Sequence, residues 1–437
     1  MNSSQLLKQA EALFPRKIDM SLGRLTHLLG RLGNPHHRLP PIIHVAGTNG
    51  KGSTCAMIRA MLQEMRLDVH AYQSPHLIRF HERIIIQGQE IAETELCCLL
   101  TQMLEANDNQ PITFFESTTA AAFSAFTKTP ADWLVLEVGL GGRLDATNLA
   151  SGPGVSVITP IDIDHHEFLG HDIMGIAAEK FGIARKERPL IVGRQRPEVS
   201  QWIETKAKEM GIQHYIFGRD FDLQNQIYKD QYGSLDLGVL PLAGTFQYDN
   251  AAVALATIRL GTSLNLRHST ETLKKGLAQT KWPGRMQDIT QAYNLSFQTN
   301  YETVTLDGGH NPHAGRAMAE FIKKKQGPID LILALQPHKD APGYLQSVGP
   351  LINNLIQIPC DENHQINDMP HPWNSQRYNN LDLACQSLSQ CKKARHLVIS
   401  GSLYLVGHVL KRLAPVTPLV RLGSDALINP GTNLTLR

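Results

Sequence analysis

The chain has 437 residues, of which 42% are hydrophobic and 19% are charged, and its formal net charge is +2 at pH 7. This length predicts two or three domains, and the composition is that of an ordinary globular protein. The nearly balanced charge gives no reason to expect a nucleic-acid or membrane partner, no run approaches 18 apolar residues, and the first residues lack the pattern of a secretory signal.

The six cysteines are dispersed, and none of them forms a C-x-x-C pair. This spacing argues against zinc-ribbon or thioredoxin-type chemistry. The adjacent Cys97 and Cys98 are poorly placed for a disulfide with each other. We therefore expect buried thiols in a reducing compartment, which predicts a cytoplasmic protein.

Apolar, β-branched runs alternate with helix-like segments in the first part of the chain, a pattern typical of a parallel sheet with helices on both faces. The first predicted strand, at 42–46, leads through a glycine-rich turn into a predicted helix at 54–65. Further strands are predicted at 69–73, 133–138, 155–159, 190–192 and 212–217. Ligands in such folds bind at the carboxyl ends of the strands, so polar segments there are expected to converge on one site.

The turn after the first strand, within I-I-H-V-A-G-T-N-G-K-G-S-T at 42–54, is the strongest single signal. Such a turn points backbone N–H groups and a helix N-terminus at one spot, which suits a polyphosphate. Lys51 is expected to reach the β- and γ-phosphates, and Ser53 or Thr54 to offer a hydroxyl to Mg²⁺. Because Gly52 separates the lysine from the serine, the loop departs from G-x-x-x-x-G-K-[ST]. The alternative is an ordinary glycine-rich turn.

Four further polar segments lie at or just beyond predicted strand ends: S-P-H-L at 74–77, E-V-G-L-G-G-R-L-D-A-T-N at 137–148, D-I-D-H-H at 162–166 followed by E-K at 179–180, and D-G-G-H-N-P-H at 307–313. Taken singly, each also fits a structural explanation, such as a buried paired carboxylate, a capped turn or a tight turn. Their occurrence together after a nucleotide loop favours a shared ligand site.

A turn-rich break, K-W-P-G-R at 281–285, follows a predicted helical stretch at 250–261. A second α/β alternation begins beyond it, with strands predicted at 303–306, 331–335, 355–358 and 396–399. The sequence therefore predicts an α/β protein in which a P-loop-type doubly wound domain, 1–287, precedes a smaller Rossmann-like domain, 288–437.

Together these segments resemble the folylpolyglutamate synthase/dihydrofolate synthase family, which belongs to a wider group of ATP-dependent amide ligases that includes the peptidoglycan Mur ligases. The resemblance covers nearly the whole chain and also includes P-G-R at 283–285 and G-S-L-Y-L-V-G at 401–407. The block at 137–148 is specific to the folate branch, and Gly52 separates the loop from the G-K-T or G-K-S of Mur ligases.

The resemblance implies an ATP-binding and folate-binding central domain, 1–287, and a glutamate-ligase domain, 288–437. It implies that ATP phosphorylates a carboxylate to an acyl phosphate, which the amine of L-glutamate then attacks to give an amide, ADP and phosphate. The expected acceptors are dihydropteroate, giving dihydrofolate, and tetrahydrofolate, which receives further γ-linked glutamates.

The T-F-F-E segment at 113–116, with 144–146, favours the bifunctional form over a monofunctional folylpolyglutamate synthase. A Mur-type cell-wall ligase is a third possibility. A nucleotide-binding protein that does not ligate is a fourth, disfavoured because a non-catalytic relative would have little reason to retain the whole set of expected catalytic residues.

By resemblance, the catalytic residues are Lys51, Glu137, His165 and Lys180. Two Mg²⁺ ions are expected, the first held by Ser74 and Glu137 and the second by His165, with K⁺ as a further candidate cation. The lysine that matches Lys180 is carbamylated in the family, which turns a cation into an anionic oxygen donor for the metal site.

The residues expected to bind ATP are Thr48, Asn49, Gly50, Lys51, Gly52, Ser53, Asn250, Arg285 and Asp307. The residues expected at the pterin end of the acceptor are Leu22, Gly23, Arg24, Thr113, Phe114, Phe115, Glu116, Leu144, Asp145 and Ala146. Aromatic rings suit a flat heterocycle, and a carboxylate can accept hydrogen bonds from its N–H groups.

Three positions depart from the family pattern. Gly23 stands where a charged residue is common, and Phe181 replaces a small residue after the lysine. The segment Q-P-H-K-D at 336–340 keeps only the Lys-Asp of the usual Asp-Lys-Asp.

By resemblance, His310 is expected near the site. A monomer is expected because the sequence has no evident coiled coil.

Overall fold

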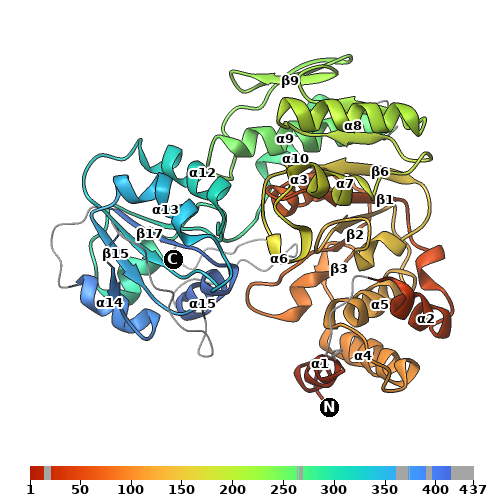
Figure 1. Cartoon of the computed structure of the whole chain (residues 1–437), viewed down its shortest axis with the longest axis horizontal. Helices are drawn as coiled ribbons and strands as arrows, with labels where there is room; N and C mark the ends of the chain where they lie inside the picture. The colour runs from red at the N-terminus through yellow and green to blue at the C-terminus, as the bar shows by residue number, and fades with distance from the viewer. Residues whose placement is uncertain are drawn as a thin grey trace, which may run out of the picture.

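Two α/β lobes make up the computed structural model, which describes residues 1–13, 21–262, 264, 269–360, 373, 375–389 and 396–414. We call the part built around the first sheet the N-terminal lobe and the part built around the last sheet the C-terminal lobe (Figure 1). This architecture confirms the predicted α/β fold class with two successive alternations.

The N-terminal lobe contains an eight-stranded sheet in the order β4-β3-β2-β5-β1-β6-β7-β8. Strands β2 to β8 of this order run parallel, whereas β3 and β4 form an antiparallel edge. The strands are β1 (Ile42–Ala46), β2 (Val69–Tyr72), β3 (Ile84–Ile86), β4 (Gln89–Glu90), β5 (Trp133–Glu137), β6 (Gly154–Ile158), β7 (Leu190–Val192) and β8 (His214–Ile216). Because β1 lies between β5 and β6, the carboxyl ends of these three strands meet at one edge.

Helices cover both faces of this sheet, because successive side chains of a strand point to opposite sides. Ile42 packs with α1 (Ser3–Ala12), α2 (Gly23–Arg31), α4 (Glu93–Asn107) and α5 (Phe114–Phe126). Ile43 and Val45 pack with α3 (Lys51–Glu64), α9 (Phe246–Ala256) and α10 (Thr270–Ala278). Helices α7 (Ile173–Phe181) and α8 (Pro197–Glu209) cover the β6 and β7 end.

A small antiparallel sheet projects from this lobe, at the top of Figure 1. Its strands are β9 (Phe221–Gln224), β10 (Ile227–Asp230) and β11 (Gly233–Asp236). The π-helix η4 (Thr257–Gly261) anchors it, because the guanidinium of Arg259 pairs at 2.7 Å with the carboxylate of Asp230 and both side chains are buried.

The C-terminal lobe contains a six-stranded sheet in the order β12-β13-β17-β14-β15-β16, parallel except for β12. Helices α11, α14 and α15 pack on one face and α12 and α13 on the other. The elements are β12 (Gln287–Asp288), α11 (Thr290–Phe297), β13 (Thr303–Leu306), α12 (Pro312–Ile322), β14 (Ile329–Leu333), α13 (Ala341–Val348), β15 (Asn354–Gln357), β16 (Gln376–Arg377), α14 (Leu381–Ser389), β17 (His396–Ser400) and α15 (Leu403–Leu413). Because β12 already belongs to this sheet, the predicted division after residue 287 falls within that strand, and we retain the division only as a proposal.

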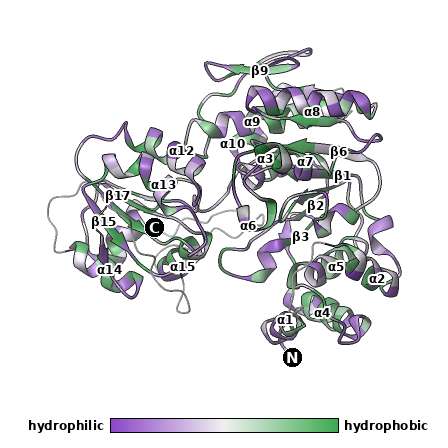
Figure 2. Ribbon diagram, in the orientation of Figure 1, coloured by the Kyte–Doolittle hydropathy of each residue, from purple (hydrophilic) through white to green (hydrophobic). Residues whose placement is uncertain are grey.

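Short helices complete the described chain: η1 (Pro35–His37), η2 (Phe80–Arg83), η3 (Ala146–Leu149), α6 (His166–Leu169) and η6 (Gly349–Leu351). Figure 2 shows that the strands of both sheets are mainly hydrophobic, whereas a surface helix such as α8 alternates hydrophobic and hydrophilic residues. Within the described ranges, no helix has the length and apolar character needed to cross a membrane.

The predicted strands at 42–46, 190–192 and 303–306 are confirmed to the residue, and the others differ at their ends by one or two residues. The first long helix begins at Lys51 rather than at 54, because Gly50 turns the chain with a φ of +85° and serves as its N-cap. The five described cysteines are free, but Cys98 is exposed on α4 rather than buried as expected.

Candidate active site

The glycine-rich loop lies between β1 and α3 and is held by the chain that follows β6. The backbone N–H groups of Thr48 and Asn49 donate to the carbonyl oxygen of Pro160 at 2.9 and 3.3 Å. At Gly50, whose φ is positive, a Cβ would collide with the side-chain oxygen of Asn250. The loop therefore requires glycine there, and Asn250 of α9, a residue that the resemblance placed near the nucleotide, lies against it.

Close packing against a tryptophan explains why residue 52, between Lys51 and Ser53, is a glycine. A Cβ at Gly52 would lie 2.6 Å from the ring of Trp282, which covers the first turn of α3. The neighbouring Ser53 is buried, and its hydroxyl lies 3.4 Å from the amide nitrogen of Gln247. No role was predicted for Trp282 or Gln247, although Trp282 belongs to the turn-rich break at 281–285.

Lys51 and Glu137 face each other at neighbouring strand ends. The Lys51 ammonium donates to the carbonyl oxygens of Gly47 and Thr48 at 3.2 and 3.4 Å. Glu137 ends β5 and is 4% exposed, so burial raises the pKa of its carboxyl, while the charge of Lys51 opposes that rise. The backbone N–H of Ser74 donates to this carboxylate at 3.3 Å. The structure therefore brings together the residues expected at the first metal.

Lys180 reaches the same loop from α7. Its side chain is 4% exposed, and its ammonium donates to the carbonyl oxygen of Gly47 at 3.0 Å. Burial, followed by the charge of Lys51, lowers the pKa of Lys180 to about 7. At neutral pH a large fraction of this amine is uncharged, unlike that of a lysine in water.

A pocket is lined by Thr48 and Lys51 of the loop, by Asp164 and His165, and by Lys180. Burial lowers the pKa of His165 to about 3, so its imidazole is neutral at physiological pH and able to act as a ligand. The pocket therefore joins three of the four expected catalytic residues, and the fourth, Glu137, is electrostatically coupled to Lys51.

The donor set fits a metal ion that is bound together with a polyphosphate. Among the residues that the structure describes, no three His, Cys, Asp or Glu side chains are grouped to hold a metal by themselves. Ser74, Glu137 and His165 offer one hydroxyl, one carboxylate and one imidazole beside the phosphate loop. Mg²⁺ typically binds one or two carboxylates, phosphate oxygens and water, so these few protein donors suit it.

Arg285 lies at the junction of the two lobes, just before β12, and Asp307 directly follows β13 of the C-terminal lobe. The carboxylate of Asp307 accepts the backbone N–H groups of Met286 at 3.0 Å and of Gly309 at 2.8 Å. These contacts favour a positioning role for Asp307 over direct contact with the ribose. The charge of Arg285 also opposes the rise in the pKa of Glu137.

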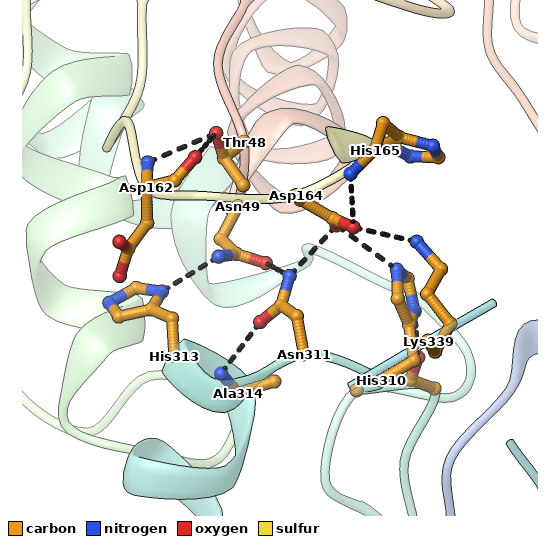
Figure 3. A network of polar contacts seen from close by, with 12 residues as sticks. Thr48, Asn49, Asp162, Asp164, His165, His310, Asn311, His313, Ala314 and Lys339 are labelled. Carbon is orange, nitrogen blue, oxygen red and sulfur yellow. Dashed lines mark hydrogen bonds and ion pairs between the residues drawn. The ribbon is translucent and has the colours of Figure 1, made fainter. Parts of the chain in front are cut away.

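Asp164 is the centre of a polar network that joins the two lobes (Figure 3). Its carboxylate accepts from Lys339 at 2.7 Å and from Asn311 at 3.0 Å, and it lies 3.4 Å from the imidazole of His310. Burial opposes ionisation of Asp164, but the hydrogen bond and charge of His310, together with those of neighbouring cations, hold its pKa far below the usual range.

The same network reaches the phosphate loop. The side-chain oxygen of Asn49 accepts from Asn311 at 3.1 Å, and its amide nitrogen lies 2.8 Å from His313. The H-N-P-H motif of the C-terminal lobe therefore contacts the nucleotide loop directly. The sequence placed Asp164 and Asn311 in motifs without giving either a role, and it left the role of Lys339 open.

We predict that Asp164→Asn lowers the free energy of unfolding by about 2–4 kcal/mol, because it leaves the buried Lys339 ammonium without its counter-charge. Denaturant unfolding provides the measurement. Asp162→Asn is the matched control: its partners Arg196 and Arg316 are about half exposed, and such pairs contribute about 0–1 kcal/mol. Equal effects of the two substitutions would contradict a buried link between the lobes.

The residues expected at the pterin end lie around the start of α5. The guanidinium of Arg24 donates two hydrogen bonds of 3.2 Å to the carboxylate of Glu116. This carboxylate also accepts the backbone N–H of Thr113 at 2.8 Å, which completes a capping box. Glu116 is thus already engaged within the protein. Leu22 is the N-cap residue of α2, and Gly23 is its exposed first residue.

The aromatic residues of this segment contact the glycine-rich block at 137–148. A Cβ at Gly139 would lie 2.5 Å from the ring of Phe115. Within the block, Asp145 accepts the backbone N–H groups of Leu140 at 2.8 Å and of Thr147 at 2.9 Å. The structure therefore brings the segments 113–116 and 144–146 to the same strand end as Glu137.

The fold and the site define the class of the protein. The features of a nucleotide-dependent ligase are present: a phosphate loop with its lysine, a buried carboxylate on the neighbouring strand of the sheet, and a second α/β lobe that contacts the loop. Residues 45–258 match the Mur ligase middle domain family.

Three relatives show the particular branch. The chain is 32% identical to the Escherichia coli dihydrofolate synthase/folylpolyglutamate synthase over 93% of its own length and 94% of the relative. It is 32% identical to the Bacillus subtilis protein of the same name over 90% and 94%. The solved structure of E. coli FolC in complex with DHPP and ADP superposes with a TM-score of 0.84 at 30% identity, covering 95% of this chain and 98% of that one. The chain therefore belongs to the dihydrofolate synthase/folylpolyglutamate synthase family, which confirms the resemblance of the motifs.

Proposed function

We propose that the protein is an ATP-dependent ligase that joins L-glutamate to dihydropteroate, giving dihydrofolate, and adds further γ-linked glutamates to tetrahydrofolate. The observation that carries this proposal is the meeting of two segments at one strand end. The phosphate loop lies on one side of Glu137, and the aromatic segment at 113–116 contacts Gly139 on the other. A phosphoryl donor and a flat aromatic acceptor would therefore meet at Glu137.

In the proposed reaction, a carboxylate oxygen of the acceptor attacks the γ-phosphorus of ATP and ADP leaves. The amine of L-glutamate then attacks the acyl carbon, phosphate leaves, and the amine loses a proton. Phosphoryl transfer depends mainly on positioning and on charge stabilisation. Lys51 and the backbone N–H groups of the loop supply this stabilisation from the N-terminal lobe, and Arg285 supplies it from the junction of the two lobes.

We include two Mg²⁺ ions in the proposal, which supply further neutralisation of the phosphates when bound, and K⁺ as an additional candidate cation. Ser74 and Glu137 would hold one Mg²⁺, and His165 with a carbamylated Lys180 would hold the other. In support, a related bifunctional synthase has been solved with Mn, AMPPNP and L-glutamate bound, at a TM-score of 0.82 and 30% identity.

A monofunctional folylpolyglutamate synthase is the alternative. The Lacticaseibacillus casei folylpolyglutamate synthase is 30% identical over 77% of this chain. A relative named for one activity is therefore about as similar in sequence as the relatives named for both. We also propose that the protein is cytoplasmic, which the lack of a disulfide among the described cysteines supports, and that it acts as a monomer.

Phosphate release with ATP, Mg²⁺ and L-glutamate tests the proposal when dihydropteroate and tetrahydrofolate are supplied separately. Release with both acceptors, with each product heavier by one glutamate residue by mass spectrometry, is the expected result. Release with tetrahydrofolate alone would identify the monofunctional enzyme. Release with neither acceptor would contradict the proposal and favour a UDP-linked substrate or a non-catalytic role.

A further inference from the structure

Arg83 lies between the aromatic segment and the phosphate site. It ends η2 (Phe80–Arg83), and its carbonyl oxygen accepts the backbone N–H of Gln73 at 3.1 Å, next to Ser74 in the chain. Its guanidinium carbon lies 5.4 Å from the centre of the Phe80 ring and 5.7 Å from that of Phe114. The positive charge therefore lies beside the ring expected to contact the acceptor and close to a residue expected to hold the metal.

Within the described part of the chain, no carboxylate forms a hydrogen bond or ion pair with this guanidinium. Among the described residues its only hydrogen bond is from Nε to the ring nitrogen of His76 at 2.9 Å, and no carboxylate lies within 4 Å of it. The adjacent Glu82 is not available, because its carboxylate accepts three backbone N–H groups of the preceding loop. By contrast, Arg24, the other arginine near these rings, is paired with Glu116.

A half-buried cation without a counter-charge is costly unless a ligand supplies the anion. The two terminal nitrogens of Arg83 donate no hydrogen bond within the described chain, and neither is fully buried. Two such nitrogens form a planar fork that matches the two oxygens of a carboxylate. The geometry thus offers one bidentate carboxylate site beside the rings of Phe80 and Phe114, which meet edge to face.

We propose that Arg83 binds the acceptor carboxylate that becomes phosphorylated, a role that rests on the proposed function. An acceptor whose heterocycle lies near the rings at 114 and 115 would extend its carboxylate toward the phosphate loop and pass Arg83. Pairing with Arg83 would reduce the repulsion between this carboxylate and the ATP phosphates, and would hold one oxygen toward the γ-phosphorus. Arg83 would thereby select acceptors that end in a carboxylate.

The test compares dihydropteroate with its carboxamide analogue, which keeps the heterocycle and the ring but lacks the negative charge. Equilibrium binding of each is measured by calorimetry in the presence of Mg²⁺ and AMPPNP, for the unaltered protein, Arg83→Gln and Arg83→Lys. Arg79→Gln is the matched control, because Arg79 lies on the same loop but its side chain is 62% exposed and pairs with Glu90.

The unaltered protein and Arg79→Gln are expected to bind the carboxylate about 10- to 100-fold more tightly than the carboxamide, as for a hydrogen bond to a charged group. Arg83→Gln is expected to lose this preference while its affinity for the carboxamide stays unchanged. Arg83→Lys is expected to keep part of the preference, because it retains the charge without the fork.

A full preference in Arg83→Gln, or an equal loss of affinity for both ligands, would overturn the assignment, the second result indicating a structural role. If Arg83→Gln does not fold, the test rests on Arg83→Lys. A preference of Arg83→Lys for the carboxylate equal to that of the unaltered protein would then overturn the assignment. Failure of the unaltered protein to bind either ligand would instead contradict the proposed function.

Discussion

Lys51→Met is expected to lower kcat for phosphate release by about 10³-fold or more, the range found when a cation that stabilises phosphoryl transfer is removed. The ammonium lies at the first turn of α3, and its charge acts on Glu137, His165 and Lys180. Methionine keeps the length of the side chain, so the loop should retain its fold. The measurement is the steady-state rate at saturating ATP, with circular dichroism to verify folding.

The substitution also has a signed effect on pH dependence. The Lys51 charge opposes the burial that raises the pKa of Glu137, so its loss is expected to raise this pKa further. Glu137 must be ionised to hold a cation. As the pH is lowered, the residual activity of Lys51→Met should therefore be lost at a higher pH than the activity of the unaltered enzyme. Lys206→Met, on the exposed face of α8, is the control and should change neither property. A rate within tenfold of the unaltered enzyme would refute the role given to Lys51.

The central strands were predictable because a parallel strand that is buried on both faces reads as a continuous apolar run. Strand β1 is fully buried along its length, as are β2 and β7. The antiparallel strands were not predicted, because they are short. Strand β3 is apolar but has only three residues, and β11 reads G-S-L-D with only its leucine buried. Strands β4, β12 and β16 have only two residues each and carry no periodicity to detect.

The site was predictable as far as its motifs are local. The loop, the Glu137 strand end and Lys180 were found because each lies in a short pattern whose chemistry can be read directly. The Asp164 network was not found, because its partners lie 147 and 175 residues away along the chain. No local signal reports such a contact, and only the docking of one lobe on the other creates it.

Glu116 shows how one pattern can carry two interpretations. The sequence T-x-x-E at 113–116 is a helix capping box, and the structure has both of its reciprocal hydrogen bonds. By resemblance to the family, the same carboxylate is expected to bind the heterocycle of the acceptor. Since Arg24 also pairs with it, binding of a heterocycle there would require Glu116 to share an oxygen that the protein already uses.

Lys180→Ala is expected to lower kcat by about 10²-fold, as when a residue that supports a metal site is removed. The reason is the carbamate proposed for Lys180. A neutral amine attacks CO₂, forming a C–N bond and releasing a proton, whereas an ammonium cannot. With a pKa of about 7, a substantial part of Lys180 is neutral at physiological pH.

The carbamate can be observed directly by ¹³C NMR in ¹³C-bicarbonate. One carbamate resonance is expected in the unaltered protein and none in Lys180→Ala, and its intensity should fall as the pH drops below about 7, where the ammonium predominates. Lys206→Ala should retain the resonance. Unchanged activity of Lys180→Ala at both low and high bicarbonate would refute the carbamate.

The same pKa predicts how stability depends on pH in CO₂-free buffer. The folded pKa is about 7 and the ordinary value is 10.5, so between these limits the unfolded chain binds more protons than the folded one. Stability must then rise with pH, by up to about 1.4 kcal/mol per unit. Lys180→Met lacks this pH-dependent contribution, so its unfolding free energy should exceed that of the unaltered protein at pH 7. The difference between the two unfolding free energies should be about 2 kcal/mol smaller at pH 9. A gap that does not change with pH would mean that Lys180 is an ordinary ammonium, which could not capture CO₂ at neutral pH.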